Sequence, residues 1–199
     1  MEMSVMSGKL KGIPALNTNT LSNPFCQKMQ KTDTICGVCY SENMLSTFRK
    51  NCVPKFERNS ERLSTEIVPE AYIPMVNAGY IRISAHGELI NLTHMRNIVR
   101  FAIKNRHANV ALWTKRIDIV HQFVAEFGEL PENLILIYSN PKIDAVRVKP
   151  PKHFHKVFNN VSGKVQGEFE ENCTGQKCIE CLLCYSKDSG TDIIVEKVK

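Results

Sequence analysis

The chain has 199 residues, of which 43% are hydrophobic and 23% are charged. These proportions are those of an ordinary globular protein and exclude an intrinsically disordered one. A chain of this length can bury a core of its own, so it does not depend on disulfide bonds as small secreted domains do. The formal net charge of +6 permits contact with nucleic acid or another anionic partner without requiring it.

The distribution of apolar residues disfavours two further classes of protein. The chain begins MEMSVMSGKLKG, which lacks the apolar stretch of a signal peptide. No run approaches the roughly 18 apolar residues that a membrane-spanning helix requires. We therefore expect a cytoplasmic protein with no membrane partner.

The N-terminal part is expected to be irregular. Residues 1–25 are rich in turn-forming residues and are interpreted as an arm, and Cys26–Ser41 is interpreted as a loop. Residues 42–77 have the apolar spacing of helices, with interruptions near their three prolines.

The centre of the chain alternates strands with helices. Strand-like segments occur at Tyr80–Ala85, Val110–Trp113 and Leu134–Tyr138, and amphipathic segments at Asn91–Arg106 and Ile117–Phe127 separate them. This alternation is typical of right-handed βαβ units and a parallel sheet. Three clear strands are too few for an eight-stranded barrel. We therefore expect an α/β protein with a partial, truncated β/α barrel-like parallel sheet and irregular, cysteine-rich termini.

The segment after the third strand is basic. Residues 142–164 contain six Lys or Arg residues and one Asp. They are interpreted as a solvated connecting loop or, alternatively, as a contact for an anion or nucleic acid. A further strand is expected within Phe158–Val165, and an edge strand at Asp192–Glu196.

Seven of the eight cysteines fall into two groups. The N-terminal group is Cys26, Cys36 and Cys39, and the C-terminal group is Cys173, Cys178, Cys181 and Cys184. Both groups contain the string CxxCYS, and thiolates with two residues between them can converge on one metal centre. Cys52 is isolated and is interpreted as a packed thiol. The pattern predicts metal binding, with disulfides or inert buried thiols as the alternatives.

Two metals fit this spacing. Zinc would take two CxxC pairs, Cys36 with Cys39 and Cys181 with Cys184, in a site of four thiolates. Iron–sulfur clusters are typically bound by longer CxxCxxC runs, and the C-terminal group contains one from Cys178 to Cys184. We expect [4Fe–4S] binding, either as one cluster that spans both groups or as two separate clusters.

Polar residues follow the expected strands at their C-terminal ends, where parallel sheets bind ligands. The candidate catalytic residues are His86, Glu88 and Lys115, and the candidate ligand-binding residues are Gly87, Ser139 and Asn140. Each also has a structural interpretation: the histidine can bond a loop carbonyl, the glutamate can stabilise a helix start, and the lysine can be solvated.

The order of the motifs resembles the phage-associated gene product 88 family. The resemblance rests on Asn17-Thr18, Cys26, the CxxCY of Cys36–Tyr40, Ala85–Leu89, Leu112–Lys115 and the terminal CxxCxxCY. It covers nearly the whole chain. It implies a phage or prophage protein that acts in the cytoplasm of a bacterial host, and the family name implies no settled activity.

A second similarity is to radical S-adenosylmethionine enzymes. These bind a [4Fe–4S] cluster through three cysteines, typically CxxxCxxC, and leave one iron open for S-adenosylmethionine, whose amino group a Gly-Gly-Glu segment binds. His86-Gly87-Glu88 is similar to that segment, whereas the spacing Cys26-x9-Cys36-x2-Cys39 departs from the pattern. The similarity implies that the Cys26–Cys39 loop covers the sheet end that bears His86 and Glu88, and that S-adenosylmethionine is a candidate ligand. With this placement we expect the C-terminal cysteine group to cap the same edge of the sheet.

These observations predict a single domain over residues 1–199. Its parts are an N-terminal arm and cysteine loop (1–41), an α/β core (42–141) and a C-terminal part with the basic loop, the cysteine group and the last strand (142–199). The expected function is iron–sulfur binding with a redox or radical-SAM-like role toward a small molecule or a redox partner. The alternative is a zinc-stabilised module that binds nucleic acid or another partner without catalysis.

Overall fold

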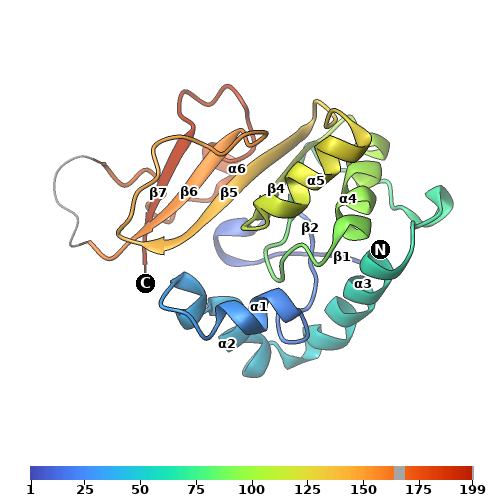
Figure 1. The fold of residues 1–199 in the computed structure, drawn as a ribbon, viewed down its shortest axis with the longest axis horizontal. Helices are drawn as coiled ribbons and strands as arrows, with labels where there is room; N and C mark the ends of the chain where they lie inside the picture. Colours follow the sequence, from blue (N-terminus) through green and yellow to red (C-terminus); the bar gives the residue numbers. More distant parts are fainter. Residues whose placement is uncertain (164–168, 199) are drawn as a thin grey trace.

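An open, mostly parallel sheet organises the fold (Figure 1). The computed structural model describes residues 1–163 and 169–198. Seven strands lie in chain order within them, the first pair antiparallel and all other pairs parallel. The strands are β1 (Met3–Ser4), β2 (Ala15–Leu16), β3 (Tyr80–Ile83), β4 (Asn109–Thr114), β5 (Leu134–Ile143), β6 (Lys156–Val161) and β7 (Ile193–Lys197). In this part of the chain no pairing joins β7 to β1, so the sheet is not closed.

Three long helices cover one face of the sheet. α3 (Val53–Thr65) precedes β3, α4 (Leu92–Lys104) connects β3 to β4, and α5 (Ile117–Phe127) connects β4 to β5. Because connections between adjacent parallel strands are right-handed, they place these helices on the same side. The helices also pack on one another, α3 on α4 and α4 on α5, as Figure 1 shows.

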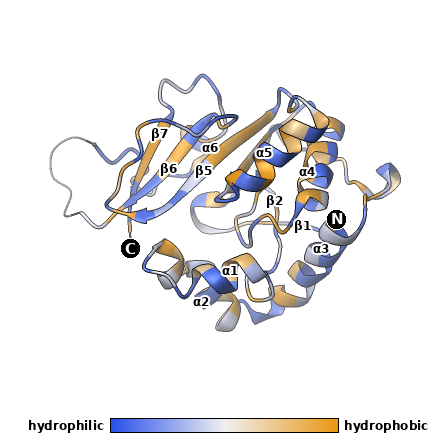
Figure 2. Cartoon of the chain, viewed as in Figure 1, coloured by the Kyte–Doolittle hydropathy of each residue, from blue (hydrophilic) through white to orange (hydrophobic). Residues whose placement is uncertain are grey.

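The main core lies between these helices and the sheet. Successive residues of a strand point to opposite faces, and one of the two sets is buried against the helices. The core includes Ile81, Ile83, Val110, Leu112, Leu134 and Leu136 from the strands and Leu63, Met95, Ile98, Phe101, Val120 and Phe123 from the helices. Figure 2 shows apolar and polar residues together on α4 and α5, as expected of helices with one buried side.

The other face, here called the inner face, is covered by the C-terminal segment. Trp113, Ile135 and Ile137 form a second core there with Tyr185. Two cysteines of the C-terminal group, Cys178 and Cys184, pack against this core together with Tyr80, Phe158 and Leu182. The C-terminal group therefore lies against the inner face, and the prediction that it caps the same sheet edge as the N-terminal group is wrong for these two residues.

The predicted α/β alternation is confirmed. β3, β4 and β5 begin within one residue of the predicted positions, and α5 has the predicted bounds. β5 continues beyond its prediction to Ile143, and β6 begins at Lys156. β7 forms the expected edge strand and pairs with β6 in parallel.

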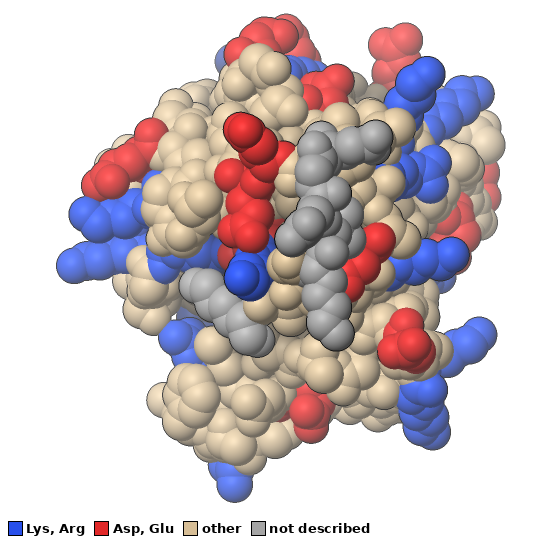
Figure 3. Space-filling model, turned by 90° about the vertical axis from the view of Figure 1, so that its left-hand side faces the viewer, with Lys and Arg blue, Asp and Glu red and all other residues tan. Residues whose placement is uncertain are grey.

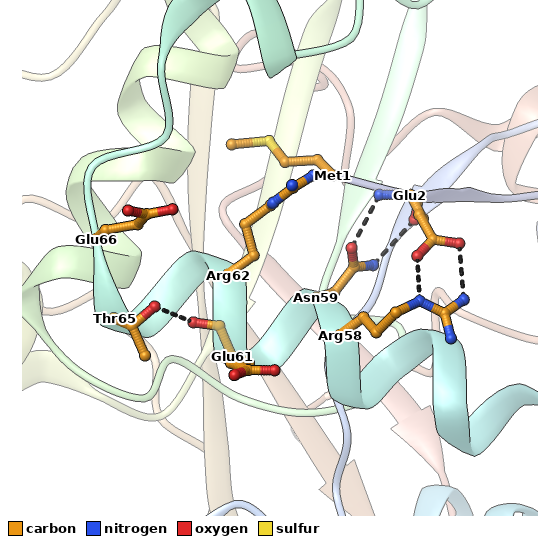
Figure 4. Close-up of a pocket in the computed structure, with 8 residues that line it drawn as sticks. All are labelled: Met1, Glu2, Arg58, Asn59, Glu61, Arg62, Thr65 and Glu66. Carbon is orange, nitrogen blue, oxygen red and sulfur yellow. Dashed lines mark hydrogen bonds and ion pairs between the residues drawn. The ribbon is translucent and has the colours of Figure 1, made fainter.

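The N-terminal arm is irregular over most of its length, as predicted, but two short strands within it join the sheet, which was not predicted. β1 and β2 pair with each other, and β2 pairs with β3. The side chain of Asn59 on α3 fixes this arm: it accepts a hydrogen bond from the Glu2 amide (2.8 Å) and donates to the carbonyls of Glu2 and Asn17 (2.9 Å each). Figure 4 shows Asn59 beside the ion pair of Arg58 with Glu2, in a pocket that contains no cysteine.

The cysteine loop of the N-terminal part is also more regular than predicted. It contains α1 (Pro24–Met29) and the 3₁₀ helix η2 (Ile35–Val38), and α2 (Tyr40–Ser46) begins inside it. The helical stretch is interrupted near Pro54, as predicted: α2 ends at Ser46 and α3 begins at Val53. Pro54 lies in the first turn of α3, where a missing backbone N–H is tolerated. Figure 1 shows α1 and α2 together below the sheet.

Candidate metal centres

The N-terminal group is carried by two short capped helices. Asn23 caps α1 by accepting hydrogen bonds from the amides of Phe25 (3.0 Å) and Cys26 (3.3 Å). The Thr34 hydroxyl caps η2 by accepting from the Cys36 amide (3.3 Å), and Cys39 follows η2 directly. These caps satisfy amides at the helix starts and fix the backbone of the cysteines.

Two hydrogen bonds join this segment to the loop after β3. The side-chain amide of Asn23 donates to the carbonyl of Glu88 (2.9 Å), and the Tyr40 hydroxyl donates to the carbonyl of Ala85. The N-terminal group therefore lies at the C-terminal end of β3, as the radical-SAM similarity implied.

Glu88 is buried and its carboxylate accepts three hydrogen bonds. One oxygen accepts from the Thr114 hydroxyl (2.5 Å) and from the Leu89 amide (2.8 Å), and the other accepts from the Lys115 amide (2.9 Å). The side chain thus joins the ends of β3 and β4. Because a carboxylate has about four acceptor positions, Glu88 retains capacity for a further donor.

Lys115 extends beside the thiols of the N-terminal group. Its ammonium donates a hydrogen bond to the Ser139 hydroxyl on β5 (3.2 Å). Burial acts to lower the pKa of Lys115, but the Glu88 carboxylate and, when they are deprotonated, the thiols of Cys36, Cys26 and Cys39 outweigh it and raise this pKa. The structure therefore brings together Lys115, Ser139 and Glu88, three of the predicted site residues, around the predicted thiols.

The thiols of the N-terminal group influence one another electrostatically. Burial raises the pKa of Cys26, and the nearby charges of Glu88 and Cys39 raise it further. Burial also raises the pKa of Cys36, which the Lys115 ammonium partly opposes. Without a metal these two thiols are expected to be protonated at neutral pH, so metal binding would release protons.

His86 and Gly87 are held by protein contacts. The His86 ring shares a hydrogen bond with the Ser41 hydroxyl (2.7 Å) and lies 5.3 Å from the Phe56 ring and 5.9 Å from the Tyr40 ring. Gly87 has a φ of +82°, and its α-carbon faces the backbone of Thr18 so closely that a β-carbon would lie 2.6 Å from the Thr18 carbonyl oxygen. Both residues have a structural reason for their identity.

The burial of the His86 side chain predicts that the folded protein is less stable at acidic pH. Burial, together with the charges of Arg49 and Arg82, lowers its pKa to about 4, while an unfolded histidine titrates near 6.5. Between about pH 6.5 and pH 4 the His86 side chain is protonated in the unfolded chain but not in the folded chain. The free energy of unfolding therefore falls as the pH is lowered from about 6.5 toward 4. At pH 5 the loss should be about 2 kcal/mol.

This loss can be measured by denaturant unfolding of the reduced protein at pH 7 and pH 5. In a His86→Gln variant, which removes the titrating group, the difference between the two pH values should be smaller by about 2 kcal/mol. An equal difference in both proteins would show that His86 does not contribute.

Asn140 does not join the predicted site. Its side-chain amide donates to the Ala145 carbonyl (2.7 Å) and to the side-chain oxygen of Asn159 (2.9 Å). It therefore fixes the connection between β5 and β6, where β5 extends beyond its predicted end.

The C-terminal group surrounds α6 (Cys178–Cys181). The Lys9 ammonium lies 3.9 Å from the Cys173 sulfur and pairs with Glu196 on β7. The side chain of Gln176 donates to the Cys181 sulfur (3.4 Å). Burial raises the pKa of Cys184 to about 12, although the charge of Arg82 opposes this shift. Cys173, Cys178 and Cys181 also act electrostatically on the Cys184 thiol and raise its pKa, so the four cysteines lie in one region of the structure.

Three residues near the cysteines were not predicted. Arg82 on β3 and Lys9 place positive charge beside the C-terminal group, and Tyr40 lies beside Cys39 at the N-terminal group. The alternation of β3 places Arg82 on the same face as Tyr80, but it does not reveal that the C-terminal segment covers this face. Tyr40 directly follows Cys39 in the CxxCYS string, which was its signal, whereas Lys9 has none, since long-range folding brings it to the C-terminal group.

All eight cysteines are free thiols of intermediate exposure. In the residues that the structure describes, no three His, Cys, Asp or Glu side chains are already arranged to hold a metal ion. Among the described residues, the Cys52 sulfur has a polar contact only with the neighbouring Asn51 side chain (3.7 Å).

No protein-family model, curated protein or solved structure matches this chain. The resemblance to gene product 88 proteins therefore stays a prediction. Among the described helices, none is long and apolar enough to cross a membrane.

The predicted basic segment is only partly available to an anionic partner. Lys156 is fully buried and donates to the Ser189 hydroxyl and the Thr191 carbonyl (2.7 Å each). Arg147 lies over the Tyr138 ring, with 5.4 Å between its guanidinium carbon and the ring centre. Lys164 lies outside the described residues. Figure 3 shows acidic and basic side chains interspersed on the face that it displays.

Proposed function

We propose that this chain is an iron–sulfur protein with two separate centres. Cys26, Cys36 and Cys39 would bind one cluster, and the C-terminal group would bind the other. The proposal rests on the arrangement at the C-terminal ends of β3 and β4, where hydrogen bonds from Asn23 and Tyr40 join the segment of the three N-terminal cysteines to the loop that bears Glu88, and where Lys115 lies within electrostatic reach of the three thiols. The donor set fits the cofactor, because thiols are the usual ligands of iron–sulfur clusters and are deprotonated when they bind.

The charged neighbours favour two centres over one shared cluster. The N-terminal thiols lie near Lys115 and Glu88, whereas the C-terminal thiols lie near Lys9, Arg82 and Glu196. The zinc alternative needs Cys36 and Cys39 in one site with the last two cysteines of the chain, which belong to the other group. Three thiolates beside a cation also suit a cluster better than a closed tetrahedral zinc site.

The N-terminal centre offers three protein thiolates, so a [4Fe–4S] cluster there would have one iron free for an exchangeable ligand and would supply single electrons. Lys115 and Ser139 are placed to orient an anionic group of that ligand, and Glu88 can accept a hydrogen bond from a cationic group. A molecule with both charges, such as S-adenosylmethionine, fits this pair. The strands lie in chain order, as they do in β/α barrels, and we infer a partial barrel. We also propose, on the resemblance to gene product 88 proteins, that the chain is a phage or prophage protein.

Anaerobic purification tests the proposal directly. The protein should be brown and contain iron and acid-labile sulfide in equal amounts, and S-adenosylmethionine should change the EPR spectrum of the reduced N-terminal centre. A colourless protein that contains zinc without sulfide would refute the proposal, because zinc has a filled d shell. An EPR spectrum unchanged by S-adenosylmethionine would refute that ligand and leave the iron–sulfur assignment intact.

A further inference from the structure

A cationic side chain, Arg82, lies on the inner face without an anionic partner among the described residues. Its neighbours in register are Ala15 on β2 and Ala111 on β4, two small residues that are fully buried. Its guanidinium carbon lies 3.1 Å from the centre of the Trp113 ring. The two alanines leave room for the long side chain to lie across this ring, an arrangement that favours a cation.

Arg82 and Tyr185 present polar atoms without hydrogen-bond partners. The Arg82 Nε is buried and has no hydrogen-bond partner in the part of the chain that the structure describes, and the buried Tyr185 hydroxyl lies beside the Arg82 guanidinium without a hydrogen bond of good geometry. The Tyr185 ring is fixed by the rings of Trp113 (5.7 Å) and Tyr80 (6.1 Å). No ion pair between described residues includes Arg82. Such groups cost free energy unless another partner satisfies them.

The cysteines are the nearest candidates for that partner. Cys178 and Cys184 pack on the same core as Trp113 and Tyr185, and the charge of Arg82 acts on both thiols. A protonated thiol carries no charge and is a weak acceptor. Thiolates bound to a cluster carry negative charge and accept hydrogen bonds, so cluster binding would provide the missing anion.

We propose that Arg82 is the positioning and charge-balancing residue of the C-terminal centre, donating a hydrogen bond to the sulfur of Cys178 or Cys184 once these bind iron. This inference rests on the proposed function. One-electron reduction adds one negative charge to the cluster, the arginine keeps its proton, and no bond forms or breaks. Arg82 therefore favours the reduced state, and the Tyr185 hydroxyl contributes a second, uncharged donor.

The test is a redox titration with dithionite, followed by EPR, of the full chain in which Cys26, Cys36 and Cys39 are replaced by serine. Only the C-terminal centre then contributes a signal. Arg82→Gln should make the midpoint potential of this centre more negative. At the midpoint potential of the reference protein, the ratio of reduced to oxidised cluster in the variant should then be about tenfold lower, which corresponds to 59 mV for one electron. Arg82→Lys, which keeps the charge, should lower it less. Tyr185→Phe should lower it about threefold, the smaller effect of losing a neutral donor.

Lys115→Gln is the matched control, because it removes a cation beside the other cysteine group, and it should leave this midpoint unchanged. Iron in the reference protein with an unchanged midpoint in Arg82→Gln overturns the inference alone. If Arg82→Gln does not fold, an unchanged midpoint in Tyr185→Phe and Arg82→Lys overturns it equally. A wild-type chain without iron overturns the proposed function together with the inference.

Discussion

Replacing Gly87 by alanine is expected to lower the free energy of unfolding by about 4 kcal/mol, at the upper end of single substitutions. The new β-carbon would lie 2.1 Å from the Thr18 hydroxyl oxygen and 2.6 Å from the Thr18 carbonyl oxygen. The hydroxyl can rotate away, but the carbonyl belongs to a backbone whose Thr18 amide donates to the His86 carbonyl (3.2 Å). The backbone must therefore move, and denaturant unfolding of the reduced protein measures the cost.

Gly190→Ala provides the matched control. Gly190 has a φ of +83°, close to the +82° of Gly87, but no described atom lies within 4 Å of the position that its β-carbon would take. It should lose only the cost of a positive φ, about 1–2 kcal/mol. Equal losses in both variants would show that the conformation of Gly87, and not the contact with Thr18, requires glycine. The close contact of Gly87 with Thr18 would also explain, without any ligand, why glycine stands in the Ala-His-Gly-Glu motif.

The sequence predicted the central part of the fold because its signals are local. α5 places Ile119, Val120 and Phe123 on its buried side, and this helical period is visible without knowledge of the sheet. β3 alternates between core and inner-face residues over Tyr80–Ile83. Elements of this kind depend on their own residues, so their bounds were predicted closely.

The N-terminal strands could not be predicted in the same way. β1 and β2 contain two residues each, too few for any period. Their existence depends on the pairing of β2 with β3 and on the hydrogen bonds of the Asn59 side chain with Glu2 and Asn17. These contacts join residues that are more than forty positions apart in the sequence. Such strands are defined by tertiary contacts, which a local pattern does not contain.

The candidate centres were predicted by residue type and only partly by position. The spacing of the cysteines defined the two groups, the strand-end rule placed Glu88 and Lys115 at the C-terminal edge of the sheet, and the radical-SAM similarity placed the N-terminal group at that edge, where the structure also has it. Arg82 was missed because an alternating strand normally turns its polar side to solvent. Here the C-terminal segment covers that side of β3, so the Arg82 side chain lies on a covered face and not in solvent.

The last prediction concerns the number of centres. The wild-type chain should bind roughly eight iron atoms, two [4Fe–4S] clusters. Serine at Cys26, Cys36 and Cys39 together should leave roughly four, and serine at Cys178, Cys181 and Cys184 together should also leave roughly four. The reason is that each group has its own charged neighbours, Lys115 for one and Arg82 with Lys9 for the other. Iron and sulfide analysis of anaerobic protein measures these contents.

Cys52→Ser is the control, because its thiol belongs to neither group and should be dispensable for iron binding. A single cluster that spans both groups predicts a different result, since either triple substitution would then remove all of the iron. The two triple variants should also differ in stability. Cys178 and Cys184 pack against Trp113 and Tyr185, so cluster binding there stabilises the cover of the inner face directly. Among the described residues the N-terminal thiols pack on no such core, and their loss should destabilise the chain less.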